Sequence, residues 1–174
     1  MNAAGLTASQ RAACNRTLLG ALLATVIMLF TGFAAAYLER STSGATWERM
    51  EFPPLLLVNT FVLLLSSVAL EWARRGQERG QERTLAPALA LGALFVTLQC
   101  VTWFMARDAG LFVSTTAYAA FFYLLTGLHA LHMVAGLIAL AYASRHRDVL
   151  RFATGFWHFM GGIWLYVLLV LTVF

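Results

Sequence analysis

The chain has 174 residues, of which 60% are hydrophobic, and its mean hydropathy is +0.74. Soluble domains are about 45–50% apolar, so this composition excludes a soluble enzyme domain and predicts a membrane protein. All 12 basic residues are arginine and the formal net charge is +4; in so apolar a chain, these charges bear on membrane topology before they bear on nucleic acid.

Five uncharged runs predict five membrane-spanning helices, because a span needs roughly 20 apolar residues. The first run is longer than the roughly 7–15 residues of a signal-peptide core and no small-residue cleavage site follows it, so we expect it to be retained. The fourth run, Leu111–Ser144, is too long for one span and too short for two, so we interpret it as an interfacial segment followed by one long helix. The sequence therefore predicts an all-α bundle in a single membrane domain, residues 1–174, with helices at about 17–38, 52–73, 85–106, 116–143 and 152–173.

The arginines predict the orientation of this bundle. If the N-terminus is inside, the inner side holds nine arginines, and the outer side holds Arg40, Arg49 and Arg107. Such a bias places the N-terminus in the cytoplasm and the C-terminus in the periplasm, which requires an odd number of spans. The inner nine are Arg11, Arg16, Arg74, Arg75, Arg79, Arg83, Arg145, Arg147 and Arg151.

The first predicted helices carry few polar residues. Residues 1–16 are expected to form a frayed tail. The second helix opens on Pro53 and Pro54 and contains Asn59, Thr60 and Ser66, and Gln99 lies in the third. Such groups often form hydrogen bonds between helices, at roughly 0.6–2 kcal/mol each. The arginine-rich loop between the second and third helices is expected to lie against anionic headgroups. It has no aromatic interleaving, so nucleic acid is not an expected partner.

Three histidines lie inside predicted helices, where ionisable groups face protein or a polar cavity. His129 and His132 are three residues apart on neighbouring parts of one helical face, and His158 lies in the last helix. His129 and His132, with His158 from the next helix, could ligate a metal, or one each could ligate a haem. Alternatively, they form hydrogen bonds across helices and pack the fourth helix on the fifth. The second interpretation is favoured, because no Asp or Glu lies well inside a predicted helix, whereas di-metal bundles use inward carboxylates.

Neither the two cysteines nor a known catalytic motif indicates a chemical activity. Cys14 and Cys100 form no CxxC or CxxCH pattern, so covalent haem attachment and thiol redox chemistry are not supported. Both are expected to be small buried hydrophobes. GxSxG, P-loop and GxGxxG motifs are absent from the sequence.

Read in order, the polar motifs resemble those of subunit III of the haem–copper respiratory oxidases, the cytochrome c and quinol oxidases. FFYLLTGLHALHMVAGLIAL, Phe121–Leu140, is similar to that family's FF-x-x-TG-x-H-x-x-H-x-x-x-G signature, and FWHFMGGIWLY, Phe156–Tyr166, is similar to its WHF-x-D-x-x-W segment. VNTFVLLLSSVAL, Val58–Leu70, and MLFTGFAAAY, Met28–Tyr37, are similar to two further family runs, and Gln99 stands where the family has a glutamine.

The resemblance implies a non-catalytic subunit with no redox centre of its own, in the five-span form of shorter bacterial members. Such a subunit packs on the catalytic subunit, holds phospholipids in a cleft, and sustains oxygen reduction coupled to proton translocation. Haem and copper are expected in the partner subunits, a larger respiratory supercomplex is a further expected partner, and the expected location is the bacterial cytoplasmic (inner) membrane. No catalytic, cofactor or metal residue is implied. The residues carried over as structural or lipid-cleft residues are Asn59, Thr60, Ser66, Gln99, Thr126, Gly127, His129, His132, Gly136, Trp157, His158 and Trp164.

The chain departs from the family pattern at three carboxylates, which are replaced at Thr25-Val26, Thr102 and Gly161. A proton-collecting role that depends on the first-span glutamate is therefore not expected, whereas packing and lipid roles are. Gly161 and Gly162 predict a close helix contact. Two alternatives stay open: an accessory protein of a nitric oxide reductase from the same wider family, and a stand-alone haem- or metal-binding membrane protein or small transporter. The lack of an internal repeat disfavours a transporter.

Overall fold

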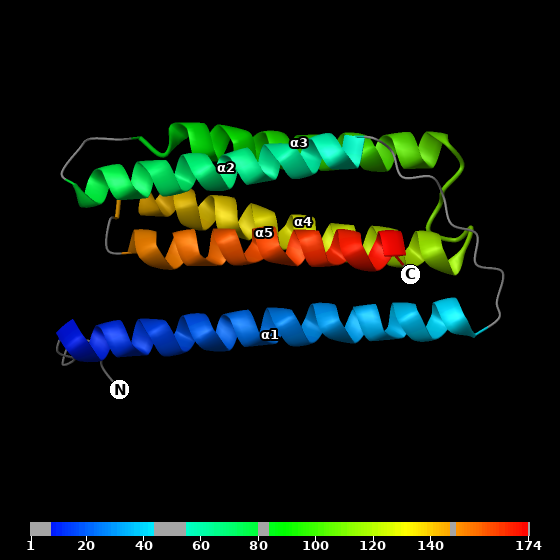
Figure 1. Ribbon diagram of the computed structural model, residues 1–174, viewed down its shortest axis with the longest axis horizontal. Helices are drawn as coiled ribbons and strands as arrows, with labels where there is room; N and C mark the ends of the chain where they lie inside the picture. Colours follow the sequence, from blue (N-terminus) through cyan, green and yellow to red (C-terminus); the bar gives the residue numbers. More distant parts are fainter. Residues whose placement is uncertain (1–7, 44–54, 80–83, 147–148, 174) are drawn as a thin grey trace.

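The described part of the protein forms five helices, and their directions alternate along the chain (Figure 1). The computed structural model describes residues 8–43, 55–79, 84–146 and 149–173. All five helices are long and apolar enough to cross a membrane. The described ranges contain no strand, so the all-α prediction is confirmed. The helices are α1 (Ala8–Thr42), α2 (Leu55–Glu78), α3 (Ala86–Asp108), α4 (Ala117–Ala143) and α5 (Leu150–Val173).

The helix ends show where hydropathy is a good guide to helix length and where it is not. α3, α4 and α5 begin and end within two residues of the predicted bounds, whereas α1 starts at Ala8 instead of 17 and ends at Thr42 instead of 38. The expectation of a frayed tail is therefore wrong for residues 8–16. Alanine, glutamine and arginine are good helix formers, so the helix continues beyond the apolar run. Pro53 and Pro54 lie outside the described residues.

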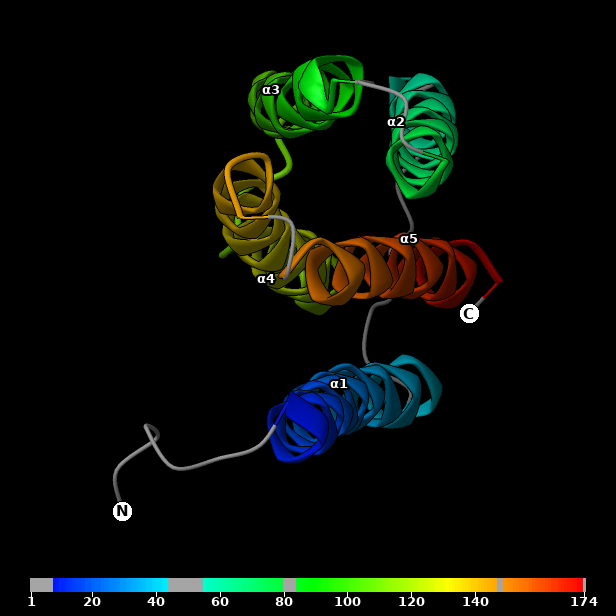
Figure 2. The same cartoon turned by 90° about the vertical axis from the view of Figure 1, so that its left-hand side faces the viewer.

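The helices form three layers, with α4 and α5 in the middle (Figure 2). The α2–α3 pair covers one side of this central layer, and α1 lies on the other. Within the described ranges, α1 packs against α4 and α5 and against no other helix. α5 contacts α1, α2 and α4, so it connects all three layers.

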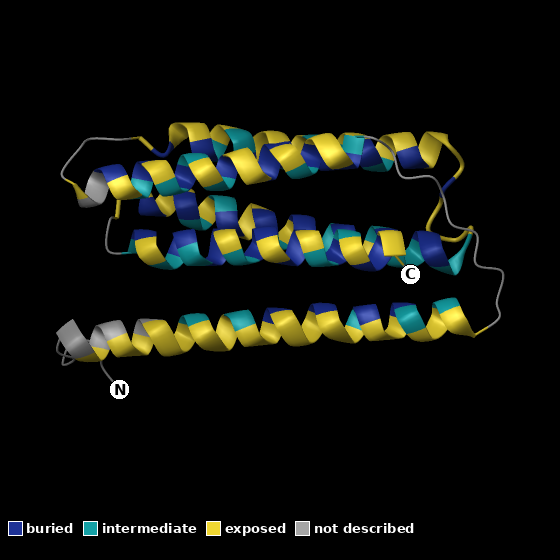
Figure 3. Ribbon diagram, in the orientation of Figure 1, coloured by how far each residue is buried: buried dark blue, intermediate teal, exposed yellow. Residues whose placement is uncertain are grey.

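α1 is attached by one narrow stripe, and most of its surface is exposed (Figure 3). The stripe contains one large aromatic residue near its middle and another near its C-terminal end. The ring of Phe30 lies 6.4 Å from that of His129 and 5.9 Å from that of His132. Tyr37 makes an edge contact with Phe121 at 5.7 Å. The spacing of three and four residues places the stripe on one helical face, and its fully buried members are Val26, Phe30, Ala34 and Tyr37.

A tight connection joins α3 to α4. Gly110 adopts a φ of 86°, a left-handed conformation that costs glycine little. Thr116 then caps α4, because its hydroxyl oxygen accepts a hydrogen bond of 3.1 Å from the backbone N–H of Ala119. The Tyr123 hydroxyl donates to the Leu111 carbonyl at 2.8 Å, which ties the connection to α4. The expected interfacial segment is therefore a compact turn that folds back on the ends of both helices.

Candidate functional site

His129 lies at the centre of the bundle, in a cage of aromatic rings. Its side chain is 0% exposed, and its ring lies 4.9 Å from that of Trp164 and 5.8 Å from that of Phe95. Phe30 completes the cage from α1. No described residue forms a hydrogen bond with either ring nitrogen. The prediction that His129 bonds across helices is therefore wrong; its contacts with α1, α3 and α5 are made by ring packing.

The other two histidines take different roles. His132 is half-buried, and its Nδ1 lies 2.7 Å from the Leu128 carbonyl oxygen, one turn back on the same helix. That interaction holds the ring in place but joins no second helix, so the prediction of a cross-helix bond is also wrong for His132. His158 is exposed and faces α2, where Glu71 lies. Across the described residues, no three His, Cys, Asp or Glu side chains form a group that could hold a metal ion.

The polar residues of α2 bind it to α3 and α5. The Asn59 side-chain amide donates to the Gln99 Oε1 at 3.0 Å, and the Ser66 hydroxyl donates to the Ala88 carbonyl at 2.9 Å. On the other side, the Trp164 Nε1 donates to the Thr60 hydroxyl at 3.0 Å. Two of these bonds come from Asn59 and Ser66, both fully buried. Such bonds hold helices together where apolar attraction alone does not distinguish protein from lipid.

A similar bond joins α3 to α4. The Trp103 Nε1 donates to the Thr126 hydroxyl at 3.0 Å, and that hydroxyl donates to the Phe122 carbonyl at 2.6 Å. Gly127 lies beside the Trp103 ring, which a side chain at that position would meet at 3.9 Å. The Trp103 indole of α3 therefore lies against Thr126 and Gly127, two residues of the α4 sequence signature.

Trp157 is wedged between glycines of two other helices and is 0% exposed. A Cβ at Gly136 of α4 would lie 3.1 Å from the Trp157 ring, and a Cβ at Gly92 of α3 would lie only 2.6 Å from it. The close contact predicted at Gly161 and Gly162 is wrong, because Gly162 has open space and Gly161 has Ser67 at 3.8 Å. The sequence motifs included Gly136 but not Gly92, since only the fold brings Gly92 to Trp157.

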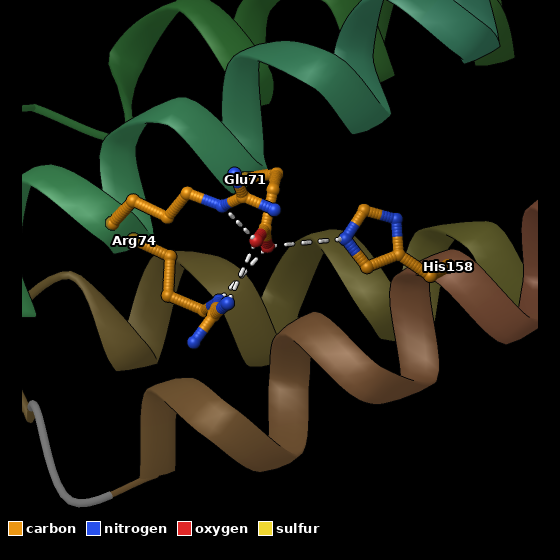
Figure 4. A network of polar contacts seen from close by, with 4 residues as sticks. Glu71, Arg74 and His158 are labelled. Carbon is orange, nitrogen blue, oxygen red and sulfur yellow. Dashed lines mark hydrogen bonds and ion pairs between the residues drawn. The ribbon is translucent and has the colours of Figure 1, made fainter.

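A charged cluster near the C-terminal end of α2 was not predicted (Figure 4). The Glu71 carboxylate accepts hydrogen bonds from Arg74 at 2.7 Å and from Arg75 at 2.6 Å. The His158 Nε2 of α5 lies 3.8 Å from the same carboxylate. Glu71 lies toward the C-terminal end of α2, which runs from Leu55 to Glu78, so it does not contradict the expectation of no carboxylate well inside a span. The signal was present in the spacing of Glu71 and its arginines, three and four residues apart on one helical face.

The structure exposes both cysteines more than the sequence suggested. Cys14 is exposed and Cys100 is partly exposed, and both are free thiols. The expectation that both are buried is therefore wrong. Cys14 lies near the N-terminal end of α1, where the described side chains at Ala13, Arg16 and Thr17 are exposed as well.

The fold and these contacts define a class: a polytopic helical membrane protein in which motif side chains join one helix to the next. Within that class, a sequence model of the family described as cytochrome c oxidase subunit III matches residues 17–174, so the chain belongs to this family. The match confirms the resemblance seen in the motifs.

Individual relatives agree with the family match. The chain is 29% identical over 165 residues to cytochrome c oxidase subunit 3 of Sus scrofa, and 30% identical over 167 residues to that of Pelomedusa subrufa. The Hippopotamus amphibius protein of the same name is 29% identical over 165 residues. These matches cover 81–82% of this chain and 62–63% of each relative, so the chain spans less than two thirds of their length.

Proposed function

We propose that this chain is a non-catalytic subunit of a haem–copper terminal oxidase in aerobic respiration. It packs on the catalytic subunit, holds lipid and sustains oxygen reduction coupled to proton translocation, and the haem and copper belong to its partners. The observation that supports this most is the use of the family's motif residues in contacts between helices. His129 and Trp164 come from two different motifs, and their rings pack together at 4.9 Å in the bundle core.

The exposure of the motif residues separates two kinds of role within this proposal. Eight of the twelve residues carried over are buried, which suits a structural role and leaves no surface for lipid: Asn59, Ser66, Gln99, Thr126, His129, Gly136, Trp157 and Trp164. The remaining four are at least partly exposed: Thr60, Gly127, His132 and His158. Among the motif residues, contact with lipid or with a partner subunit is therefore assigned to these four.

The proposed location is the bacterial cytoplasmic membrane, with all five helices in one membrane domain and the N-terminus inside. At one end of the bundle, where α1 and α5 begin, the described side chains include six arginines. The opposite end has Arg40 and Arg107. This asymmetry is the one that cytoplasmic loops show. The six are Arg16, Arg74, Arg75, Arg79, Arg145 and Arg151.

Removal of the chain from its host tests this function. Oxidase purified from cells without the chain should keep its haem and copper, since this subunit supplies neither. Its activity should decline during continued turnover, and restoring the chain should reverse that decline. Loss of the haem spectrum on removal of the chain would instead make the chain part of a redox centre and would contradict the proposal.

A further inference from the structure

An apolar groove lies at the outer end of the bundle, where α3 turns into α4. Its volume is about 400 Å³, within the range of about 300–1,000 Å³ that ligand pockets occupy. Trp103, Phe104 and Arg107 line it from α3, and Phe112 and Val113 line it from the connecting turn. Phe104, Phe112 and Val113 are exposed, so the groove opens to the surroundings of the bundle.

Most polar groups in this α3–α4 groove are already engaged. The Trp103 Nε1 donates to Thr126, and the Tyr123 hydroxyl donates to the Leu111 carbonyl. Arg107 differs, because it is exposed and no ion pair joins it to another side chain in the described part of the protein. Its neighbour Asp108 does not line the groove. The groove therefore combines an apolar wall with one available cation at its edge.

A second pocket at the same end of the bundle shows why the net charge of a pocket matters for binding an anion. Its volume is about 370 Å³, and it lies between α1 and α4, where both Glu39 and Arg40 line it. The two charges offset one another, so that pocket offers no net attraction to an anion. The α3–α4 groove has Arg107 and no acidic residue.

We propose that the α3–α4 groove binds an anionic phospholipid of the outer leaflet, with an acyl chain on the apolar wall and the phosphate on Arg107. This proposal rests on the lipid-holding role proposed above and assigns that role a site and a lipid class. Tryptophan and tyrosine are enriched at headgroup depth, as Trp103 and Tyr123 would be here. The arginine guanidinium suits a phosphate because it can donate two parallel hydrogen bonds to its oxygens.

The test uses the chain purified with its partners in mild detergent. The preparation is incubated with phosphatidylglycerol or with phosphatidylcholine, and retained lipid is counted by native mass spectrometry. We expect preferential retention of phosphatidylglycerol, reduced about fivefold by Arg107→Gln, the loss typical of one basic residue beside an anionic headgroup. Arg145→Gln is the matched control, because it removes one exposed arginine from the opposite end of the bundle.

A second variant, Val113→Trp, keeps Arg107 and fills the groove, and it should lower retention of both lipids. Equal retention of the two lipids by the unaltered chain, or equal effects of Arg107→Gln and Arg145→Gln, would overturn the proposal. Haem absorbance in the same preparation reports on the proposed function separately. A preparation without haem would overturn that function, while the lipid ratio would still decide whether the groove binds an anionic lipid.

Discussion

At the scale of single residues, His129 is the most unusual position, because a buried polar side chain normally has a hydrogen-bond partner. Its neighbours are the rings of Phe30, Phe95 and Trp164. Aromatic pairs of this kind contribute about 0.5–1.5 kcal/mol each beyond the area that they bury. Ring shape therefore explains this position better than hydrogen bonding does, since neither ring nitrogen has a partner among the described residues.

Two substitutions at His129 separate shape from polarity. His129→Ala leaves a cavity inside the cage and should lower the free energy of unfolding by about 2–5 kcal/mol. His129→Leu retains most of the volume and removes both ring nitrogens, so it should cost less than about 1.5 kcal/mol. Thermal unfolding in mild detergent measures both. If His129→Leu is as costly as His129→Ala, the ring nitrogens make an essential interaction and the packing explanation is wrong.

Gly92 gives the second prediction at this scale. A Cβ there would lie 2.6–2.8 Å from the Trp157 ring and 2.8 Å from Leu137. Gly92→Ala should therefore destabilise the protein by about 1–3 kcal/mol, the usual cost of overpacking a core. Gly32→Ala is the matched control, because nothing lies within 4 Å of its Cβ. We expect this control to unfold at an unchanged or higher temperature. Similar losses of stability in both variants would contradict the tight packing of Trp157 against Gly92.

At the scale of helices, α1 is the element most weakly held. Its buried stripe contacts α4 and α5, while exposed residues such as Met28, at 75%, make up the rest of its surface. Phe30 is 0% exposed and is the largest apolar member near the middle of the stripe. In the complex that we propose, the exposed side of α1 would be available for contact with lipid or with a partner subunit.

Phe30→Ala should therefore loosen α1 specifically. Replacement of a buried phenylalanine by alanine lowers stability by about 3–5 kcal/mol. Here the lost contacts are those that hold α1 on the bundle. Met28→Ala, two residues away, should have little effect. In the variant Ala34→Cys, reaction of the new thiol with a thiol reagent would report whether α1 stays docked, because Ala34 is only 1% exposed. Equal reaction rates with Phe30→Ala and Met28→Ala would show that the stripe does not hold α1.

The contact between α2 and α5 at Glu71 is predicted to be weak. Glu71 and His158 are 26% and 39% exposed in their side chains, and exposed ion pairs contribute about 0–1 kcal/mol. A double-mutant cycle with Glu71→Gln and His158→Ala should therefore give a coupling energy below about 1 kcal/mol in thermal unfolding. A coupling several times larger would mean that this cluster, rather than the hydrogen bond between Trp164 and Thr60, joins the two helices.

Hydropathy predicted the number of helices and most of their ends, because a long apolar run in this chain is stable only as a helix. Side-chain partners were harder to predict. Gly92 carries no local signal for its contact with Trp157, which depends on how α3 faces α5 across α4. The spacing of Glu71 to Arg74 and Arg75 indicates this cluster, but Glu71 lies just beyond the uncharged run, which ends at Leu70. The motif resemblance identified His129 as important, but it did not show whether the side chain forms a hydrogen bond across helices or packs against aromatic rings.

At the scale of the whole molecule, the three layers are held together mainly by contacts of α5. Trp164 bonds to α2 and packs on His129 of α4, and Trp157 fills the space between α3 and α4. The molecule is thus a preassembled unit with apolar outer surfaces, which suits a subunit that supports a larger membrane complex. Its family membership is consistent with that use.

The most direct test of this account is a mild-detergent pull-down on the chain, with mass spectrometry and an optical spectrum of the material that comes with it. We predict haem absorbance that travels with a large multi-span partner and a copper-binding subunit, and that disappears from this chain when the two are separated. Haem absorbance that stays with the isolated 19.1 kDa chain would contradict the account and would make its histidines ligands.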